Sequence, residues 1–121
     1  MAGVETVDFD SPDETRTPEK TRVDVVRLGG TTAARMTFEP GWKWSECVKP
    51  VAGTDSCQLR HVGVVVSGGL VVKHEDGTEV ELSSGDAYVI EPGHDAWVTG
   101  DESFVGYEFE ARAADTYAQG D

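Results

Sequence analysis

Residues 85–100 read GDAYVIEPGHDAWVTG, a short apolar stretch between two turn signals with a histidine just past the second turn. Tyr88, Val89 and Ile90 favour a pleated, half-buried surface, whereas glycine and proline favour turns. His94 follows the Pro92-Gly93 turn directly. The segment therefore predicts a strand, a tight turn and a histidine at the exit of that turn.

The rest of the chain repeats this alternation of short strands and turns, without a long 3.6-residue period. Asp76-Gly77 is the strongest local hairpin signal, because a tight turn favours residues that accept positive φ. Strands are predicted at Arg22–Leu28, Thr32–Phe38, Trp42–Val48, Gln58–Val66, Leu70–His74, Glu79–Leu82, Ala87–Ile90, Ala96–Val98 and Ser103–Phe109. Many short strands at this spacing are typical of a sandwich or barrel, so we expect an all-β fold with almost no helix.

Length and charge restrict the class of protein. A chain of 121 residues predicts one domain with a single modest core. The 23 acidic and 10 basic residues give a formal net charge of -13, which argues against nucleic acid and anionic membranes as partners. No apolar run approaches the roughly 20 residues of a membrane span. The chain does not begin with a basic stretch followed by an apolar one, so we expect no secretory signal and a cytoplasmic location.

The two ends of the chain differ from its middle. Residues 1–20 hold six acidic residues and two X-Pro pairs, and they predict a flexible acidic N-terminal arm. Residues 111–121 predict a C-terminal tail, which leaves residues 21–110 as the folded domain. An alternative is that either arm adds an edge strand to a neighbouring subunit.

Residues 85–100 resemble the second motif of the cupin superfamily, in which Gly, five residues, Pro-x-Gly and two further residues precede a histidine. An upstream segment resembles the first motif: Gly41 is followed by five residues and then by Cys47-Val48-Lys49, and six residues separate His61 from Gly68. Eleven residues separate Lys49 from His61, where the motif has three or four. The resemblance covers about residues 38–109. It implies a small antiparallel double-stranded β-barrel, also called a jelly roll, with acidic arms at both ends.

The resemblance also implies where a metal would bind. The four cupin ligand positions fall on Cys47, Lys49, His61 and Ala96, of which only Cys47 and His61 are ordinary ligands. His94 lies two residues before the fourth position, so a site of Cys47, His61 and His94 is one alternative, with Zn, Fe, Ni or Mn as the divalent transition metal. Cys57 is another candidate thiolate. The other alternative is a barrel that has no metal.

The same positions outline a ligand cavity. Its predicted lining is Cys47, Lys49, His61 and His94, with Trp44 or Trp97 at the wall. His61 and Lys49 are the candidate catalytic residues, because an imidazole exchanges a proton near pH 7 and an ammonium holds an anion.

Three classes of function remain open at this point. The first is a protein that binds a small organic molecule and has a degenerate or absent metal site. The second is a small cupin enzyme, either metal-dependent or an acid–base isomerase, cyclase or lyase. The third is an interaction protein whose barrel only presents a surface. We expect a homodimer, because small antiparallel barrels leave strand edges that need protection. Two cysteines without a framework spacing predict reduced thiols, and a bridge between Cys47 and Cys57 would pin the loop between them.

Overall fold

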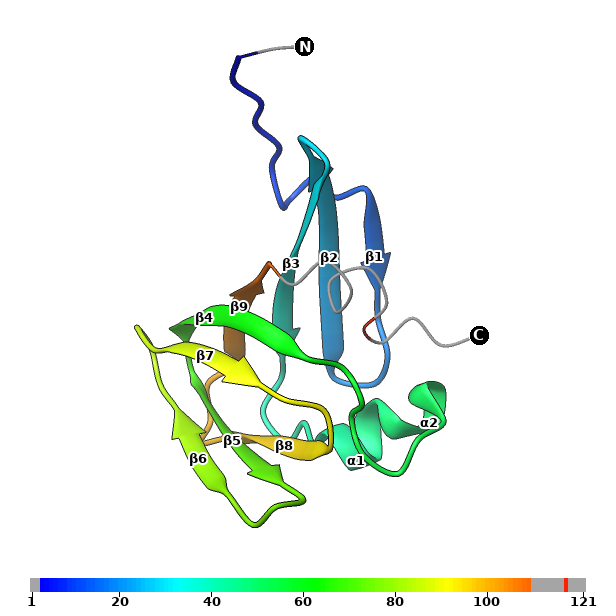
Figure 1. Ribbon diagram of the computed structural model, residues 1–121, viewed down its shortest axis with the longest axis vertical. Helices are drawn as coiled ribbons and strands as arrows, with labels where there is room; N and C mark the ends of the chain where they lie inside the picture. Colours follow the sequence, from blue (N-terminus) through cyan, green and yellow to red (C-terminus); the bar gives the residue numbers. More distant parts are fainter. Residues whose placement is uncertain (1–2, 110–116, 118–121) are drawn as a thin grey trace.

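The computed structural model describes residues 3–109 and Tyr117 (Figure 1). Within them, short strands carry almost all of the regular structure, as expected for an all-β fold. The elements in chain order are β1 (Glu14–Arg16), β2 (Thr21–Leu28), β3 (Thr31–Phe38), α1 (Trp44–Cys47), α2 (Lys49–Ala52), β4 (His61–Ser67), β5 (Gly69–His74), β6 (Glu79–Leu82), β7 (Ala87–Ile90), β8 (His94–Thr99) and β9 (Phe104–Glu108).

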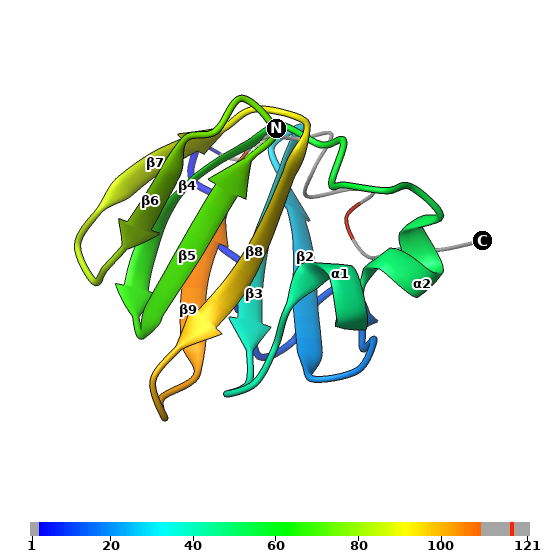
Figure 2. The ribbon, with the colours of Figure 1, turned by 90° about the horizontal axis from the view of Figure 1, so that it is seen from below.

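In the described part of the chain, the strands form two antiparallel sheets. The large sheet has the order β1-β2-β3-β9-β4-β7, and the small sheet has the order β6-β5-β8. The two sheets face one another, with the small sheet across one face of the large one (Figure 2). Their facing side chains form the core together with residues of α1 and the turn before it, and its largest fully buried members are Trp42, Trp44 and Phe104. Within this core, the Phe38 ring stacks on the Trp42 ring with centroids 3.9 Å apart.

Most of the predicted strands are confirmed. The Asp76-Gly77 turn joins β5 to β6, with Gly77 at φ 96° as a tight turn requires. Two strands begin more than one residue from the predicted start: β4 begins at His61 rather than at Gln58, and β8 begins at His94 rather than at Ala96.

The predicted strand Trp42–Val48 is wrong, because the chain there forms α1 and enters α2. Trp44, Cys47 and Val48 are the buried positions, and their i, i+3, i+4 spacing is that of a helix face. Pro50 sits in the first turn of α2, where its missing N–H costs no hydrogen bond, and Gly53 ends that helix in the left-handed region. α1 packs against β8, and its residue Trp44 is part of the core.

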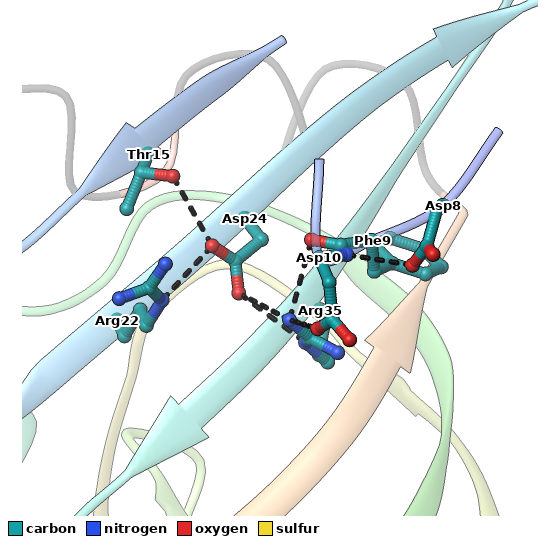
Figure 3. Close-up of polar contacts among 7 residues, drawn as sticks. All are labelled: Asp8, Phe9, Asp10, Thr15, Arg22, Asp24 and Arg35. Atoms are coloured by element: carbon teal, nitrogen blue, oxygen red, sulfur yellow. Dashed lines mark hydrogen bonds and ion pairs between the residues drawn. The ribbon is translucent and has the colours of Figure 1, made fainter. Parts of the chain in front are cut away.

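The expectation of a flexible arm over residues 1–20 is wrong for Glu14–Arg16, which form strand β1 on the edge of the large sheet. The cause is a polar anchor that the sequence did not reveal. Asp24 on β2 is fully buried, and it accepts hydrogen bonds from Thr15 on β1 at 3.1 Å and from Arg35 on β3 at 3.0 Å (Figure 3).

Arg35 extends this anchor toward the start of the chain. Its guanidinium also bonds Asp10 at 2.9 Å and lies 5.7 Å above the Phe9 ring, which packs on Tyr107. The expected C-terminal tail at residues 111–121 lies outside the described residues, apart from Tyr117. Among the residues that the structure describes, no helix is long and apolar enough to cross a membrane.

Candidate metal and ligand site

Three buried side chains meet inside the barrel: Cys57, His61 and His94. One potential ligand atom of each lies within 4.8 Å of those of the other two, and each residue is less than 5% exposed. His61 opens β4, His94 opens β8, and Cys57 lies in the loop before β4. An isolated bridge sets Cys57 opposite His94: the Cys57 amide donates to the His94 carbonyl at 2.8 Å, and the Gly93 amide donates to the Cys57 carbonyl at 2.7 Å.

His61 is held by a chain of buried hydrogen bonds. Its Nδ1 lies 2.7 Å from Glu108 Oε1 on β9, and the Tyr88 hydroxyl on β7 donates to Glu108 Oε2 at 2.7 Å. This leaves His61 Nε2 facing the Cys57 sulfur at 3.4 Å. Gly63 makes the arrangement possible, because a Cβ there would clash with the Tyr107 carbonyl and lie 2.9 Å from the Tyr88 hydroxyl.

His94 is oriented in the same manner. Its Nδ1 lies 2.8 Å from the Glu91 carbonyl oxygen, which can only accept, so this nitrogen carries the proton. In the neutral ring, Nε2 then keeps its lone pair. Both histidines therefore bind through Nδ1 to an acceptor of the protein and leave Nε2 for a ligand.

The electrostatics of the cluster favour a thiolate beside an imidazolium when no metal is bound. Burial raises the pKa of Cys57, but hydrogen bonds from His61 and His94 outweigh it and lower the pKa to about 6. Burial likewise lowers the pKa of His61, but the Glu108 carboxylate and the Cys57 sulfur outweigh it and raise the pKa to about 10. Burial and Glu108 raise the pKa of Tyr88 far above its usual value, so Tyr88 remains a neutral donor.

A small cavity lies beside this cluster. Its volume is about 20 Å³, and its lining includes His61, His94, Trp44, Tyr88 and Tyr117. Roughly 10–15 Å³ suffices for one water, so the cavity admits little more than that. Trp44 is 2% exposed, and its Nε1–H has no hydrogen-bond partner in the part of the chain that the structure describes. A buried donor without an acceptor is costly, which marks this indole as a contact for a small polar group.

A larger groove of about 510 Å³ runs between β6 and β7 and is lined by Val72, Val80, Leu82, Tyr88 and Ile90, among others. It shares Tyr88 and Ile90 with the small cavity but is not lined by Cys57, His61 or His94. His61 and His94 therefore line the small cavity and not the large groove, whose polar lining residues are His74, Asp76, Thr78 and Glu91.

The cluster suits a transition metal. A tetrahedral zinc ion places a thiolate sulfur and an imidazole nitrogen roughly 3.6 Å apart, from Zn–S of about 2.3 Å and Zn–N of about 2.0–2.1 Å. The 3.4 Å between Cys57 Sγ and His61 Nε2 is close to that spacing. Metal-binding histidines almost always donate their second nitrogen to a carboxylate or a carbonyl, as His61 does to Glu108 and His94 does to Glu91.

The structure brings together only some of the residues predicted from the sequence. His61, His94 and Trp44 all line the cavity, and His94 is buried. Cys47 is buried on α1 but is not part of the cluster; Cys57 supplies the sulfur instead. Lys49 lies at the surface on α2, where its side chain is 43% exposed and its Nζ is 3.9 Å from Asp55.

Trp97 also lies outside the cavity. Along β8, His94 and Ala96 are buried while Trp97 is half-buried, as strand alternation requires. The Trp97 ring instead lies 5.6 Å from the Lys43 ammonium. Glu108, Tyr88 and Tyr117 were not predicted, and the spacing of Glu108 and Tyr88 from His61 carries no sequence signal, because sheet pairing brings them together.

Comparison with known proteins places the fold. No protein-family model matches the chain, and no curated protein matches it. Among solved structures, KdgF from Halomonas sp. is 24% identical, with a TM-score of 0.58 over 85% of this chain and 92% of that one. A sugar phosphate isomerase described as a cupin, from Silicibacter pomeroyi, is 19% identical, with a TM-score of 0.61 over 86% of this chain and 73% of that one.

This chain folds as a small cupin. A Klebsiella pneumoniae protein with a double-stranded β-helix domain agrees, at 18% identity and a TM-score of 0.56 over 88% of this chain and 83% of that one. The two facing sheets are thus the double-stranded barrel that the motifs implied. The Cys57–His61–His94 cluster lies inside this cupin barrel.

Proposed function

We propose that this cupin binds a small organic molecule at a divalent transition metal held by Cys57, His61 and His94. The observation that carries the proposal is the orientation of the two histidines. Each commits Nδ1 to an acceptor, Glu108 or the Glu91 carbonyl, and leaves Nε2 for the metal.

The donor set selects among the metals. One thiolate and two imidazoles suit zinc, whereas manganese prefers oxygen ligands, of which the cluster has none. Three protein ligands leave a position open for a small molecule, as is usual in sites that bind or convert one. When bound, zinc would act there as a Lewis acid. The protein's own groups fix the histidine tautomers and bury the site, so that a ligand is bound away from bulk water.

A second candidate is an enzyme that uses acid–base chemistry without a metal. Cys57, His61 and Glu108 form a line in which the imidazole lies 3.4 Å from the sulfur and 2.7 Å from the carboxylate. A thiolate beside an imidazolium is the arrangement of an activated nucleophile or a proton donor pair. One of the similar cupin structures is described as a sugar phosphate isomerase, but one fold hosts many functions, so the fold favours neither candidate.

Titration of the metal-free protein with Co²⁺ separates the two candidates. We expect a thiolate-to-cobalt charge-transfer band that saturates at about one ion per chain and is absent in Cys57→Ser. The Cys47→Ser variant is the matched control, because Cys47 is the other buried free cysteine and should leave the band unchanged. No band in the unmodified protein would reject the metal and favour the acid–base candidate.

A further inference from the structure

Tyr117 fills the space beside the candidate metal site. It is 4% exposed, its ring centroid lies 5.1 Å from that of His61 at an interplanar angle of 79°, and it lies 6.3 Å from the Phe38 ring. Its backbone carbonyl accepts a hydrogen bond from Arg16 on β1 at 2.9 Å. A residue that follows the last strand of the barrel therefore places a phenol ring against a predicted metal ligand.

The cavity is too small for an organic ligand while this ring is present. Sites for small organic molecules measure about 300–1,000 Å³, whereas this cavity is about 20 Å³. The other aromatic residues of the lining belong to the strands, to α1 or to the Phe38–Trp42 stack of the core. Tyr117 lies outside both sheets, so it can leave without breaking strand pairing.

The polar groups around the ring indicate the chemistry of a ligand. Trp44 Nε1–H offers a donor that no described residue uses. Glu108 is already bound by His61 and Tyr88, and Lys49 lies at the surface beside Asp55. The lining therefore offers aromatic surface and one hydrogen-bond donor that no described residue uses.

We propose that the Tyr117 ring occupies the position of the site's ligand, and that this ligand is a single-ring aromatic molecule with a hydrogen-bond acceptor for Trp44 Nε1. The inference rests on the proposed function, because it names the class of small molecule bound at the same site. Tyr117 then competes with the ligand and has to leave the cavity before the ligand enters.

The test uses p-cresol, which is the tyrosine side chain cut from its backbone. Its affinity is measured by isothermal titration calorimetry for the full-length protein, for Tyr117→Ala and for Tyr107→Ala. Tyr107 is the matched control, because it packs on Phe9 and not in the cavity. We expect Tyr117→Ala to bind p-cresol at least tenfold more tightly than the unmodified protein and Tyr107→Ala to match the unmodified protein. Trp44→Phe in the Tyr117→Ala background should lower the affinity about five- to tenfold.

A second variant covers the case in which Tyr117→Ala does not fold. Arg16→Met keeps the tyrosine ring but removes the hydrogen bond to its carbonyl, so p-cresol affinity should rise several-fold. Equal p-cresol affinity in all variants, or binding by none, would overturn the inference. Each protein is also assayed with and without zinc. Binding of p-cresol without any metal binding contradicts the proposed metal site alone, whereas metal binding without p-cresol binding contradicts this inference alone.

Discussion

Replacing Glu108 by glutamine tests whether the buried carboxylate, by binding His61 Nδ1, orients Nε2 of His61 toward a metal. Both oxygens of Glu108 accept: Oε1 from His61 Nδ1 and Oε2 from the Tyr88 hydroxyl, each at 2.7 Å. A glutamine amide has one accepting oxygen, so it can serve only one of these two donors, and its NH₂ group faces the other. Glu108→Gln keeps the shape of the side chain and breaks this match.

The expected effect is a 10- to 100-fold loss of zinc affinity, the usual range for a residue that supports a metal ligand. This equals about 1.4–2.7 kcal/mol at about 1.4 kcal/mol per tenfold change. That size agrees with the loss of one charge-assisted hydrogen bond, worth roughly 1.5–3 kcal/mol. The assay is competition for zinc against a chromophoric chelator, with unfolding measured in parallel to confirm that the variant is folded.

Glu91→Gln is the matched control. Its carbonyl binds His94, but its carboxylate is exposed and pairs with Arg60, so the same substitution should leave zinc affinity within about twofold. Equal zinc affinity for Glu108→Gln and the unmodified protein would refute the role assigned to Glu108. Equal losses in both variants would show a general effect of removing charge.

Three further tests concern the packing at Gly63, the protons released when zinc binds, and the buried carboxylate of Asp24. Gly63→Ala should destabilise the fold by about 1–3 kcal/mol and weaken zinc binding, because the added Cβ collides with the Tyr107 carbonyl and crowds the Tyr88 hydroxyl. Urea unfolding measures the stability and the chelator assay measures the zinc affinity. A variant with unchanged stability would contradict the packing around Gly63. Zinc binding should release about one proton between pH 6 and 10 and about two below pH 6, since the pKa of Cys57 is about 6 and that of His61 about 10. The zinc affinity should thus rise about tenfold per pH unit from pH 6.5 to 8.5. Calorimetry in buffers of different ionisation enthalpy measures the number of protons released, and a zinc affinity that does not change with pH would contradict the prediction. Asp24→Asn should cost about 1–3 kcal/mol, because Thr15, Arg22 and Arg35 all bond its buried carboxylate; thermal unfolding equal to that of the unmodified protein would show that this anchor is dispensable.

The barrel could be predicted from the sequence because its strands and turns are determined by residues that lie close together in the chain. Strand and turn residues alternate along the chain, and glycines such as Gly77 stand where the backbone requires positive φ. The prediction of a strand at Trp42–Val48 was wrong because these residues fit both the two-residue period of a strand and the 3.6-residue period of a helix. Alternation of Trp42 and Trp44 suggested a strand, while the burial of Trp44, Cys47 and Val48 follows a helix.

The site was predicted less well because sheet pairing determines it. His61 and His94 followed from their positions beside turns, but the choice of Cys47 over Cys57 relied on the spacing of a motif that carries an insertion here. The insertion contains residues 50–52 of α2, and the chain after them runs back so that Cys57 pairs with His94 in an isolated bridge. The hydrogen bonds from Tyr88 to Glu108 and between Glu108 and His61 depend on the registers of β7 and β9 against β4, which the sequence pattern does not specify.

Elemental analysis of the protein purified without chelator tests directly whether Cys57, His61 and His94 hold a metal. We expect about one zinc ion per chain in the unmodified protein and in Cys47→Ser, and almost none in Cys57→Ser, His61→Ala or His94→Ala, with every variant shown to be folded. Metal retained by Cys57→Ser but lost from Cys47→Ser would contradict the assigned ligands, and an unmodified protein that neither contains nor takes up a divalent metal would contradict the metal site itself.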